Sequence, residues 1–348
     1  MSKLRISQVM LTAGFGGAER LFIDLCQDLA KDGHEVLAIC HPFFRNISLL
    51  AHQRVTIAPL KAQLDWSPLS RYRLKKIFTA FRPQIVHTHL ARGAAIAGDV
   101  AASLGIPAAA NLHDYVNLKY YRNIKYFFPG TEDQQRYLIA KGIKPEVITV
   151  IPHFSNVPPV TGVAPSSDAL PVLVAYGRFE ANKGFHNLIK SVGLLASQGI
   201  KFRLLLGGDG PEKANLQALI DSLGLAGFVS LTGWVEDVAE FLDRGSYFIL
   251  PSLQEAFGIV ILEAMARGKT IISTAVKGPR EILDDSTAYL VEAGDIDAMA
   301  RALAESLANR AEAQRRAANA LAKYRQKYTS ATVIPCFMKA YEQMLAAS

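Results

Sequence analysis

Two acidic residues, Glu255 and Glu263, enclose seven residues that carry no charge. This stretch follows an apolar run, Tyr247–Ser252, that has the character of a β-strand, so we expect a helix from Phe257 to Gly268. The free N–H groups and positive dipole end of such a helix suit a bound phosphate. On a helix, the two acids would lie ~12 Å apart along the axis, which fits the two ends of a nucleotide sugar. A strand-loop-helix unit with two incidental carboxylates would explain the spacing as well.

Two cations form a second candidate for anion binding. Arg178 and Lys183 each adjoin a glycine in the segment after Val172–Tyr176, which we expect to be a strand. Ligands of doubly wound α/β sheets bind at the carboxyl ends of strands, which favours phosphate binding here over two solvated surface charges. His113 also follows an expected strand, but the residues alone do not separate a site histidine from a structural one.

A third candidate is the glycine pair Gly16-Gly17, which stands between an expected strand and an expected helix. Glycine allows a ligand to approach the backbone closely, although a tight turn without any ligand would also explain the pair. The segment is not a complete dinucleotide fingerprint, because Glu19 stands where G-x-G-x-x-G requires its third glycine. The second strand also ends without an acid for a ribose, so a nicotinamide enzyme is unexpected.

Other nucleotide and metal motifs are incomplete. Gly268-Lys269-Thr270 lacks the earlier glycine of a P-loop, since Glu263 occupies that position. Asp295-Ile-Asp297 is better interpreted as the cap of a helix than as a metal-binding pair. No cluster of histidine or cysteine has metal-ligand spacing, so we expect no metal.

The composition predicts a soluble, well-packed α/β protein. The chain has 348 residues, more than one core usually serves, and 50% are hydrophobic while 20% are charged. No apolar run approaches the ~18 residues of a membrane span, and the N-terminus has the pattern of a strand rather than a signal peptide. Of the three cysteines, Cys26 and Cys40 lie in apolar surroundings, which predicts buried thiols in a cytoplasmic protein.

The net charge of +7 indicates an anionic partner. Nucleic acid is the least favoured, because no aromatic RNP strand or recognition-helix pattern accompanies the basic residues. Phosphorylated substrates and an acidic membrane surface stay open. Arg71–Lys76 is a basic helical patch, and Lys119–Phe128 mixes bases with aromatics as membrane-interface surfaces do, although an ordinary amphipathic helix and strand would explain both.

Apolar runs alternate with helical patterns in both halves of the chain, which predicts two doubly wound domains with parallel sheets. Ser155–Ser167, rich in Pro, Ser and Gly, is the best candidate for a linker. We expect an acceptor-side domain at 1–160, a nucleotide-binding domain at 161–330 and a helix at 331–348 that packs back on the first. The expected strands are Leu4–Leu11, Glu35–Cys40, Ile85–His87, Ala108–Leu112, Val172–Tyr176, Phe202–Leu206, Val229–Thr232 and Tyr247–Ser252. The expected helices include Ala18–Asp32, Arg92–Leu104, Phe185–Gln198, Glu212–Leu223 and a short one at Tyr115–Lys125.

In their joint order and spacing, these motifs resemble those of family 4 of the retaining glycosyltransferases, and the resemblance covers essentially the whole chain. It implies the GT-B fold, in which two tandem Rossmann-like α/β domains face each other across a cleft. The matching segments are Gly16–Glu19, His113-Asp114, Gly177–Gly184, Gly207–Pro211 and the E-x7-E segment from Pro251 to Ala266. One departure is the segment Lys277–Glu281, which begins with Lys277-Gly278 where the family commonly shows two glycines. Its two added cations, Lys277 and Arg280, could favour a charged sugar or acceptor or be simply exposed.

The resemblance also implies roles. Arg178 and Lys183 would hold the donor diphosphate and replace the divalent metal of other transferases. Glu255 would contact sugar hydroxyls, and His113 would lie over the sugar near the reacting carbon. The other donor-binding residues would be Gly16, Gly17, Val235 for the base, the backbone N–H groups of Ala256, Phe257, Gly258 and Ile259 for the phosphate, and Glu263 for the ribose.

We therefore expect a cytoplasmic, metal-independent, retaining hexosyltransferase that uses a nucleotide-diphosphate sugar, with UDP favoured by family frequency. The expected acceptor is a glycan or lipid-linked molecule of the cell envelope, such as lipopolysaccharide core, exopolysaccharide or glycolipid. Peripheral contact with an anionic membrane stays open. Alternatives are a nucleotide-sugar epimerase or soluble disaccharide synthase on the same fold and, in another class, a non-catalytic nucleotide-sugar-binding subunit.

Overall fold

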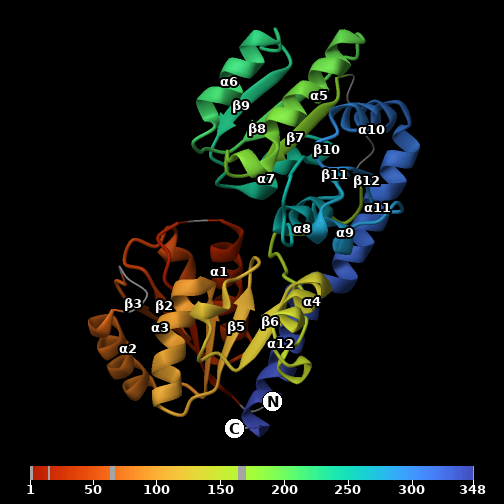
Figure 1. The fold of residues 1–348 in the computed structure, drawn as a ribbon. Helices are drawn as coiled ribbons and strands as arrows, with labels where there is room; N and C mark the ends of the chain where they lie inside the picture. Colours follow the sequence, from red (N-terminus) through yellow and green to blue (C-terminus); the bar gives the residue numbers. More distant parts are fainter. Residues whose placement is uncertain (1–2, 15, 63–66, 164–169, 348) are drawn as a thin grey trace. The chain divides into compact units, whose positions relative to one another are not determined.

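The computed structural model describes residues 3–14, 16–62, 67–163 and 170–347. They form two compact units, one made of Met1–Phe154 with Ser330–Ser348 and the other of Ser155–Thr329. Figure 1 shows that each unit is built from its own sheet with helices packed against it. Of the expected linker, Ser155 to Val163 contains no helix or strand, and the remainder lies outside the described residues.

The first unit contains a six-stranded sheet with the order β3-β2-β1-β4-β5-β6. All neighbouring strands are parallel, and the chain order reverses between β1 and β4. The strands are β1 (Arg5–Met10), β2 (Glu35–Cys40), β3 (Val55–Pro59), β4 (Ile85–His89), β5 (Ala108–Leu112) and β6 (Tyr126–Pro129). The helices are α1 (Gly17–Lys31), α2 (Pro68–Phe81), α3 (Leu90–Ser103), α4 (Glu132–Ala140) and α12 (Ser330–Ala346), with short 3-10 turns at Ile47–Leu50, Leu118–Tyr120 and Pro145–Val147.

The second unit repeats this architecture with the order β12-β11-β10-β7-β8-β9. Again all pairs are parallel, and the chain order reverses between β7 and β10. The strands are β7 (Val172–Tyr176), β8 (Arg203–Gly207), β9 (Val229–Gly233), β10 (Tyr247–Leu250), β11 (Thr270–Thr274) and β12 (Tyr289–Val291). The helices are α5 (Phe185–Ser197), α6 (Lys213–Ser222), α7 (Val238–Asp243), α8 (Ile259–Ala266), α9 (Lys277–Ile282), α10 (Ile296–Ala308) and α11 (Arg310–Lys327), with a 3-10 turn at Ala181–Lys183.

The C-terminal helix α12 belongs to the first unit. Its aromatic residues Phe337 and Tyr341 are fully buried and contact the rings of Phe128 on β6 and His87 on β4. In Figure 1 the helix, in blue, accordingly lies beside β6. Helix α12 therefore packs on the core of the first unit through these aromatic side chains.

Two expected helices differ from the structure. The one expected from Phe257 begins at Ile259, because Gly258 adopts a left-handed conformation with φ +98°. The one expected at Tyr115–Lys125 is only the turn Leu118–Tyr120, whose preceding Asn117 accepts a hydrogen bond from the backbone N–H of Lys119. Such local bonds compete with helix formation.

The prediction that Lys119–Phe128 forms a membrane-interface surface is wrong for three of its five aromatic side chains, because these three are buried. Tyr121, Phe127 and Phe128 are 3%, 2% and 1% exposed, because Tyr121 and Phe127 pack in the hydrophobic core of the first unit and Phe128 packs against Phe337 of α12. Asp295 caps α10 as expected, accepting a hydrogen bond from Ala298 N–H at 2.8 Å.

Within the described residues, no helix is both long and apolar enough to cross a membrane.

The two cysteines expected to be buried thiols are buried and free. Cys26 lies in α1 and Cys40 ends β2, and neither side chain is exposed. Burial raises the pKa of the Cys40 thiol to about 11, since a thiolate would lose its hydration there. At neutral pH both are therefore unreactive parts of the core.

Candidate functional site

The carboxyl ends of the second sheet share one edge, because all of its strands are parallel. Its chain order reverses between β7 and β10, and ligands of open α/β sheets bind at such a reversal. The loop after β7 carries Arg178 and Lys183, while the loop after β10 carries Glu255. Strand order therefore brings together residues that are 72 positions apart in the chain.

The two loops are held in direct contact by a glycine. Gly184 has φ +68°, and a Cβ placed on it would lie 2.0 Å from the carbonyl oxygen of Pro251. Leu253 N–H donates to the carbonyl of Asn182 at 2.8 Å, which ties the loops a second time. Both the left-handed conformation and the close approach require glycine at this position.

Lys183 and Glu255 form an ion pair across the joined loops. Lys183 Nζ donates to Glu255 Oε2 at 2.7 Å, and the two side chains are only 22% and 16% exposed. Arg178 lies on the same loop but is 60% exposed and pairs with Glu180 at 3.0 Å. A pair that is this exposed contributes little to stability, so a phosphate could replace Glu180 at small cost. The sequence analysis assigned Lys183 and Glu255 to the same site, but it did not predict that their side chains form an ion pair.

The turn from Glu255 to Gly258 is shaped by the segment after β11. Gly278 N–H donates to the carbonyl of Glu255 at 3.0 Å. A Cβ on Gly278 would lie 2.6 Å from the N, Cα and O atoms of Phe257, so only glycine fits. In the described structure no side chain caps α8, whose N-terminus follows this turn. Ala256 and Ile259 are partly buried, and Phe257 and Gly258 are buried.

The two remaining candidates of this unit lie deeper. Glu263 is 2% exposed and accepts a hydrogen bond from the hydroxyl of Tyr176 at the end of β7. Val235, just after β9, is partly buried and covers the end of β8, where a Cβ on Gly207 would lie 2.4 Å from its Cγ2. Their contacts with ribose and base stay predictions. The extra cation Arg280 pairs with Glu292 at 2.6 Å.

Gly16 and Gly17 lie in the first unit, at the turn from β1 into α1. Gly16 is the N-cap in extended conformation, and no side chain among the described residues caps the helix. A carboxylate already lies beside this turn: Glu19, 8% exposed, accepts from Thr12 Oγ1 at 2.8 Å. A Cβ on Gly16 would lie 3.4 Å from Glu19 Oε2. Donor binding by the two glycines stays a prediction.

His113, which follows β5, belongs to a row of four histidines in the first unit. The ring centroids of successive pairs are 4.8 Å (His87–His89), 5.2 Å (His89–His113) and 5.2 Å (His113–His153) apart. Burial lowers the pKa of His87 to about 3 and that of His153 to about 4, and it also lowers the pKa values of His89 and His113. The whole row is therefore neutral at pH 7.

The sequence analysis singled out only His113 of this row. The signal for His87 and His89 was the alternation His87-Thr88-His89, because alternate residues of a strand point to the same face. In the described part of the chain, no group of three or more His, Cys, Asp or Glu residues is arranged to hold a metal ion. Metal independence stays a prediction.

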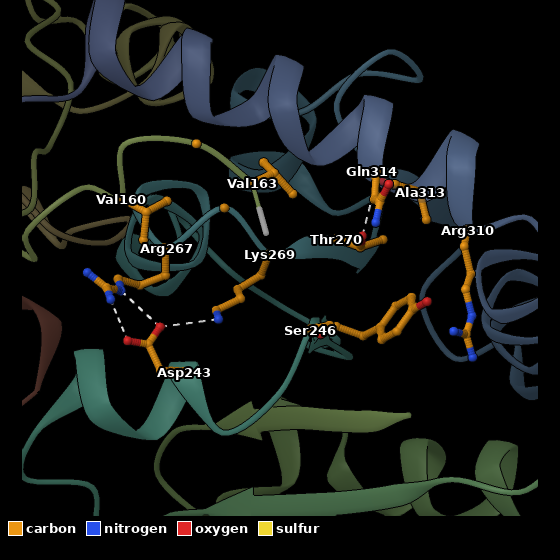
Figure 2. A pocket seen from close by; sticks show the side chains of 13 residues that line it. Val160, Val163, Asp243, Ser246, Arg267, Lys269, Thr270, Arg310, Ala313 and Gln314 are labelled. Atoms are coloured by element: carbon orange, nitrogen blue, oxygen red, sulfur yellow. Dashed lines mark hydrogen bonds and ion pairs between the residues drawn. The ribbon is translucent and has the colours of Figure 1, made fainter. Parts of the chain in front are cut away.

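A pocket of about 270 Å³ in the second unit lies at the amino ends of β10 and β11, the opposite edge from Glu255. Figure 2 shows Asp243 between Arg267 and Lys269, which pair with it at 3.1 Å (Arg267 Nε) and 3.2 Å (Lys269 Nζ). Arg267 also donates to the carbonyl of Pro158 at 2.6 Å. These charges satisfy one another and hold the segment that leads out of the first unit, so we assign the pocket no donor role.

Replacing Gly278 with alanine should destabilise the second unit by about 2 kcal/mol, because the added methyl group overlaps the Phe257 backbone and overpacks the turn. Urea unfolding measures the change. Gly227→Ala is the matched control, since nothing lies within 4 Å of its Cβ position, and it should stay within about 0.5 kcal/mol of the wild type. Equal stability of the two variants would contradict the close approach.

Acidification should weaken the first unit selectively. The folded pKa values of His87 and His153, about 3 and about 4, lie below the ordinary value of 6.5, so the unfolded chain binds more protons as the pH falls through 6.5. Stability is therefore nearly complete above pH 6.5, and these two residues should remove about 4 kcal/mol of it by pH 5. Hydrogen exchange of β4 and β5 should accelerate accordingly while that of β7 and β8 stays nearly constant. Equal acceleration in both units, or none, would contradict the prediction.

Comparison with known proteins identifies the family. Residues 15–157 match the model described as Glycosyltransferase Family 4, and residues 163–323 match Glycosyl transferases group 1. The lipopolysaccharide core biosynthesis glycosyltransferase LpsE of Rhizobium meliloti is 30% identical over 318 residues, covering 84% of this chain and 86% of the relative.

Solved structures agree on the fold. A glycosyltransferase from Rickettsia africae has a TM-score of 0.86 at 20% identity and covers 100% of both chains. HepE of Anabaena, in complex with UDP and glucose, has a TM-score of 0.83 at 19% identity, covering 97% of this chain and 99% of its own. As its motifs predicted, the chain belongs to the family 4 glycosyltransferases and has the GT-B fold.

Proposed function

We propose that this glycosyltransferase moves a hexose from a UDP-sugar to a glycan or lipid-linked acceptor of the cell envelope, with retention at the anomeric carbon and without a bound metal. The observation that carries the proposal is the partly buried Lys183–Glu255 pair at the strand-order reversal of the second sheet. The LpsE relative is named for lipopolysaccharide core biosynthesis, and HepE was solved with UDP and glucose. These names support the acceptor class and the donor.

In this proposal the pair supplies a positive charge for the diphosphate and a negative charge for the sugar. Lys183, with Arg178 and the N-terminus of α8, binds the diphosphate and stabilises the negative charge that grows as it leaves. Glu255 accepts hydrogen bonds from sugar hydroxyls and places an anion near the carbon that becomes positive. Because Lys183 and Glu255 already occupy fixed positions, little reorganisation accompanies the reaction.

Retention follows by a front-face displacement. Retaining glycosidases use two carboxyl groups about 5 Å apart, one of them as nucleophile. Here Glu255 is paired with Lys183, and Glu263 is buried against Tyr176, an arrangement that favours binding roles. The bond from the anomeric carbon to the diphosphate oxygen breaks, the acceptor oxygen bonds to that carbon on the same face, and the acceptor proton passes to the departing diphosphate.

Peripheral contact with an anionic membrane is a further part of the proposal. Helix α2 presents exposed Leu69 and Tyr72, 57% and 58% exposed, beside exposed Arg73, Lys75 and Lys76. Lys76 Nζ lies 4.7 Å from the centre of the Tyr72 ring. The helix carries no acidic residue, so its exposed face combines apolar and basic groups as membrane-surface helices do.

Replacing Lys183 with methionine or Glu255 with glutamine should lower turnover roughly 10²-fold or more, as the loss of a preorganised charge at a reaction centre does. Turnover of UDP-sugars with a crude envelope glycolipid acceptor measures the effect. Lys190→Met is the matched control, because Lys190 is an exposed cation on the nearby helix α5, and it should keep wild-type turnover. Unchanged turnover in the Lys183 and Glu255 variants would remove the pair from the mechanism.

The same assay tests donor and stereochemistry. UDP-sugars should raise the melting temperature more than GDP- or ADP-sugars do, because a ligand stabilises the native state more the more tightly it binds to it. The product should keep the donor's anomeric configuration, and chelation of metals should leave turnover unchanged. An inverted product would refute retention. UDP release that needs no acceptor and leaves an isomerised sugar would favour an epimerase. Donor binding without any turnover would favour a non-catalytic binding subunit.

Charge reversal on α2, by Lys75→Glu with Lys76→Glu, should weaken binding to vesicles with an anionic lipid roughly 30-fold or more, since each of the two lost basic residues contributes about 1 kcal/mol near the surface. Vesicle sedimentation measures this. Lys141→Glu with Lys144→Glu is the control, because both lysines are exposed in the same unit and Lys141 also lies over a tyrosine ring, that of Tyr137. Equal weakening by both double variants would contradict a role for α2.

A further inference from the structure

A chain of buried hydrogen bonds leads from His113 to the C-terminal helix. His113 Nε2 lies 2.9 Å from His89 Nδ1, and His89 Nε2 lies 2.9 Å from Gln8 Oε1. Gln8 Nε2 donates to the Tyr341 hydroxyl at 3.2 Å, and that oxygen lies 2.7 Å from His87 Nδ1. Apart from the half-buried His113, every member is 0% exposed, so water does not replace these bonds.

Gln8 determines which groups donate and which accept along this chain of hydrogen bonds. Its amide oxygen can only accept, so His89 must carry its proton on Nε2. Burial keeps His89 neutral, because its pKa is well below the usual value, and its Nδ1 is therefore an acceptor. His113 must then carry its own proton on Nε2 and donate it to His89. Nδ1 of His113 is left without a proton, and among the described residues it has no hydrogen-bond partner.

Tyr341 holds Gln8 in the orientation that sets this direction. The amide nitrogen of Gln8 donates to the Tyr341 oxygen, which also lies within hydrogen-bond distance of His87 Nδ1. Without that oxygen, the amide group could turn over and donate to His89 Nε2. His89 and His113 would then both carry their protons on Nδ1.

We propose that Gln8 and Tyr341 are positioning residues for His113, which they hold in its neutral form with the proton on Nε2. The proposal rests on the function proposed above, together with the role that the resemblance implies for His113, near the reacting carbon of the donor sugar. Because the transition state of glycosyl transfer has positive charge at the sugar, a neutral ring avoids a repulsion that an imidazolium would cause. Burial lowers the pKa of His113, which makes its unprotonated Nδ1 a poor base, so the departing diphosphate takes the acceptor proton.

The direct test is NMR of the full chain with ¹⁵N-labelled histidine, in which two-bond couplings report which ring nitrogen carries the proton. His113→Gln and His89→Gln assign the signals. From pH 6 to pH 8, the wild type should show His89 and His113 neutral with the proton on Nε2. Tyr341→Phe and the nearly isosteric Gln8→Met should each populate the Nδ1–H form of both histidines.

Phe337→Leu is the control for packing, since Phe337 lies on the same helix and contacts the His87 ring without joining the chain. It should leave both tautomers unchanged. In turnover assays, Tyr341→Phe should lower kcat roughly fivefold, the factor that one hydrogen bond typically contributes, with the acceptor KM unchanged. Phe337→Leu should keep kcat within about twofold of wild type.

The tautomer measurement needs no donor, so it stays decisive if no sugar nucleotide is turned over and the proposed function fails. A wild-type His113 with its proton on Nδ1, or one charged at pH 7, would overturn the proposal. So would an unchanged tautomer in Tyr341→Phe and Gln8→Met, or the same change in Phe337→Leu. A changed tautomer in Tyr341→Phe with wild-type kcat would overturn the positioning role.

Discussion

The ion pair between Lys183 and Glu255 is the interaction on which the proposed donor site depends. Removing a cation and an anion from water is costly, and the pair offsets that cost only through its short distance of 2.7 Å. That distance requires the loops after β7 and β10 to touch, which the glycine at position 184 allows. The glycine at position 278 then fixes the turn that follows Glu255.

The two units have the same sheet topology, but they differ in the charge of the residues at the point where the strand order reverses. At the order reversal of the second sheet, charged residues lie on loops beyond the strand ends. At the reversal of the first, polar residues lie within the strands: Gln8 of β1 is the register partner of His87 on β4. Burial keeps those groups neutral, so the first unit holds an uncharged histidine row where the second holds a fixed cation and anion.

Strands and the site loops could be predicted from the sequence because buried parallel strands are apolar runs with turn residues after them. The resemblance added which loop residues to expect. Contacts between distant segments could not be predicted. Gly278 packs against the turn that precedes α8, and the hydrogen-bond chain from His113 reaches Tyr341, which is 254 positions from its neighbour His87. The helix expected after His113 failed for a local reason, the turn bonded to Asn117.

The most direct test of the donor site is hydrogen exchange of the whole chain with and without UDP-glucose and UDP-N-acetylglucosamine. The account predicts slower exchange, with at least one of these donors, in the segments 177–184, 251–259 and 277–281. It predicts no change around Asp243, Lys269 and Gln314, the pocket at the opposite edge. Protection confined to that pocket, or protection that persists undiminished in Lys183→Met, would contradict the central claim.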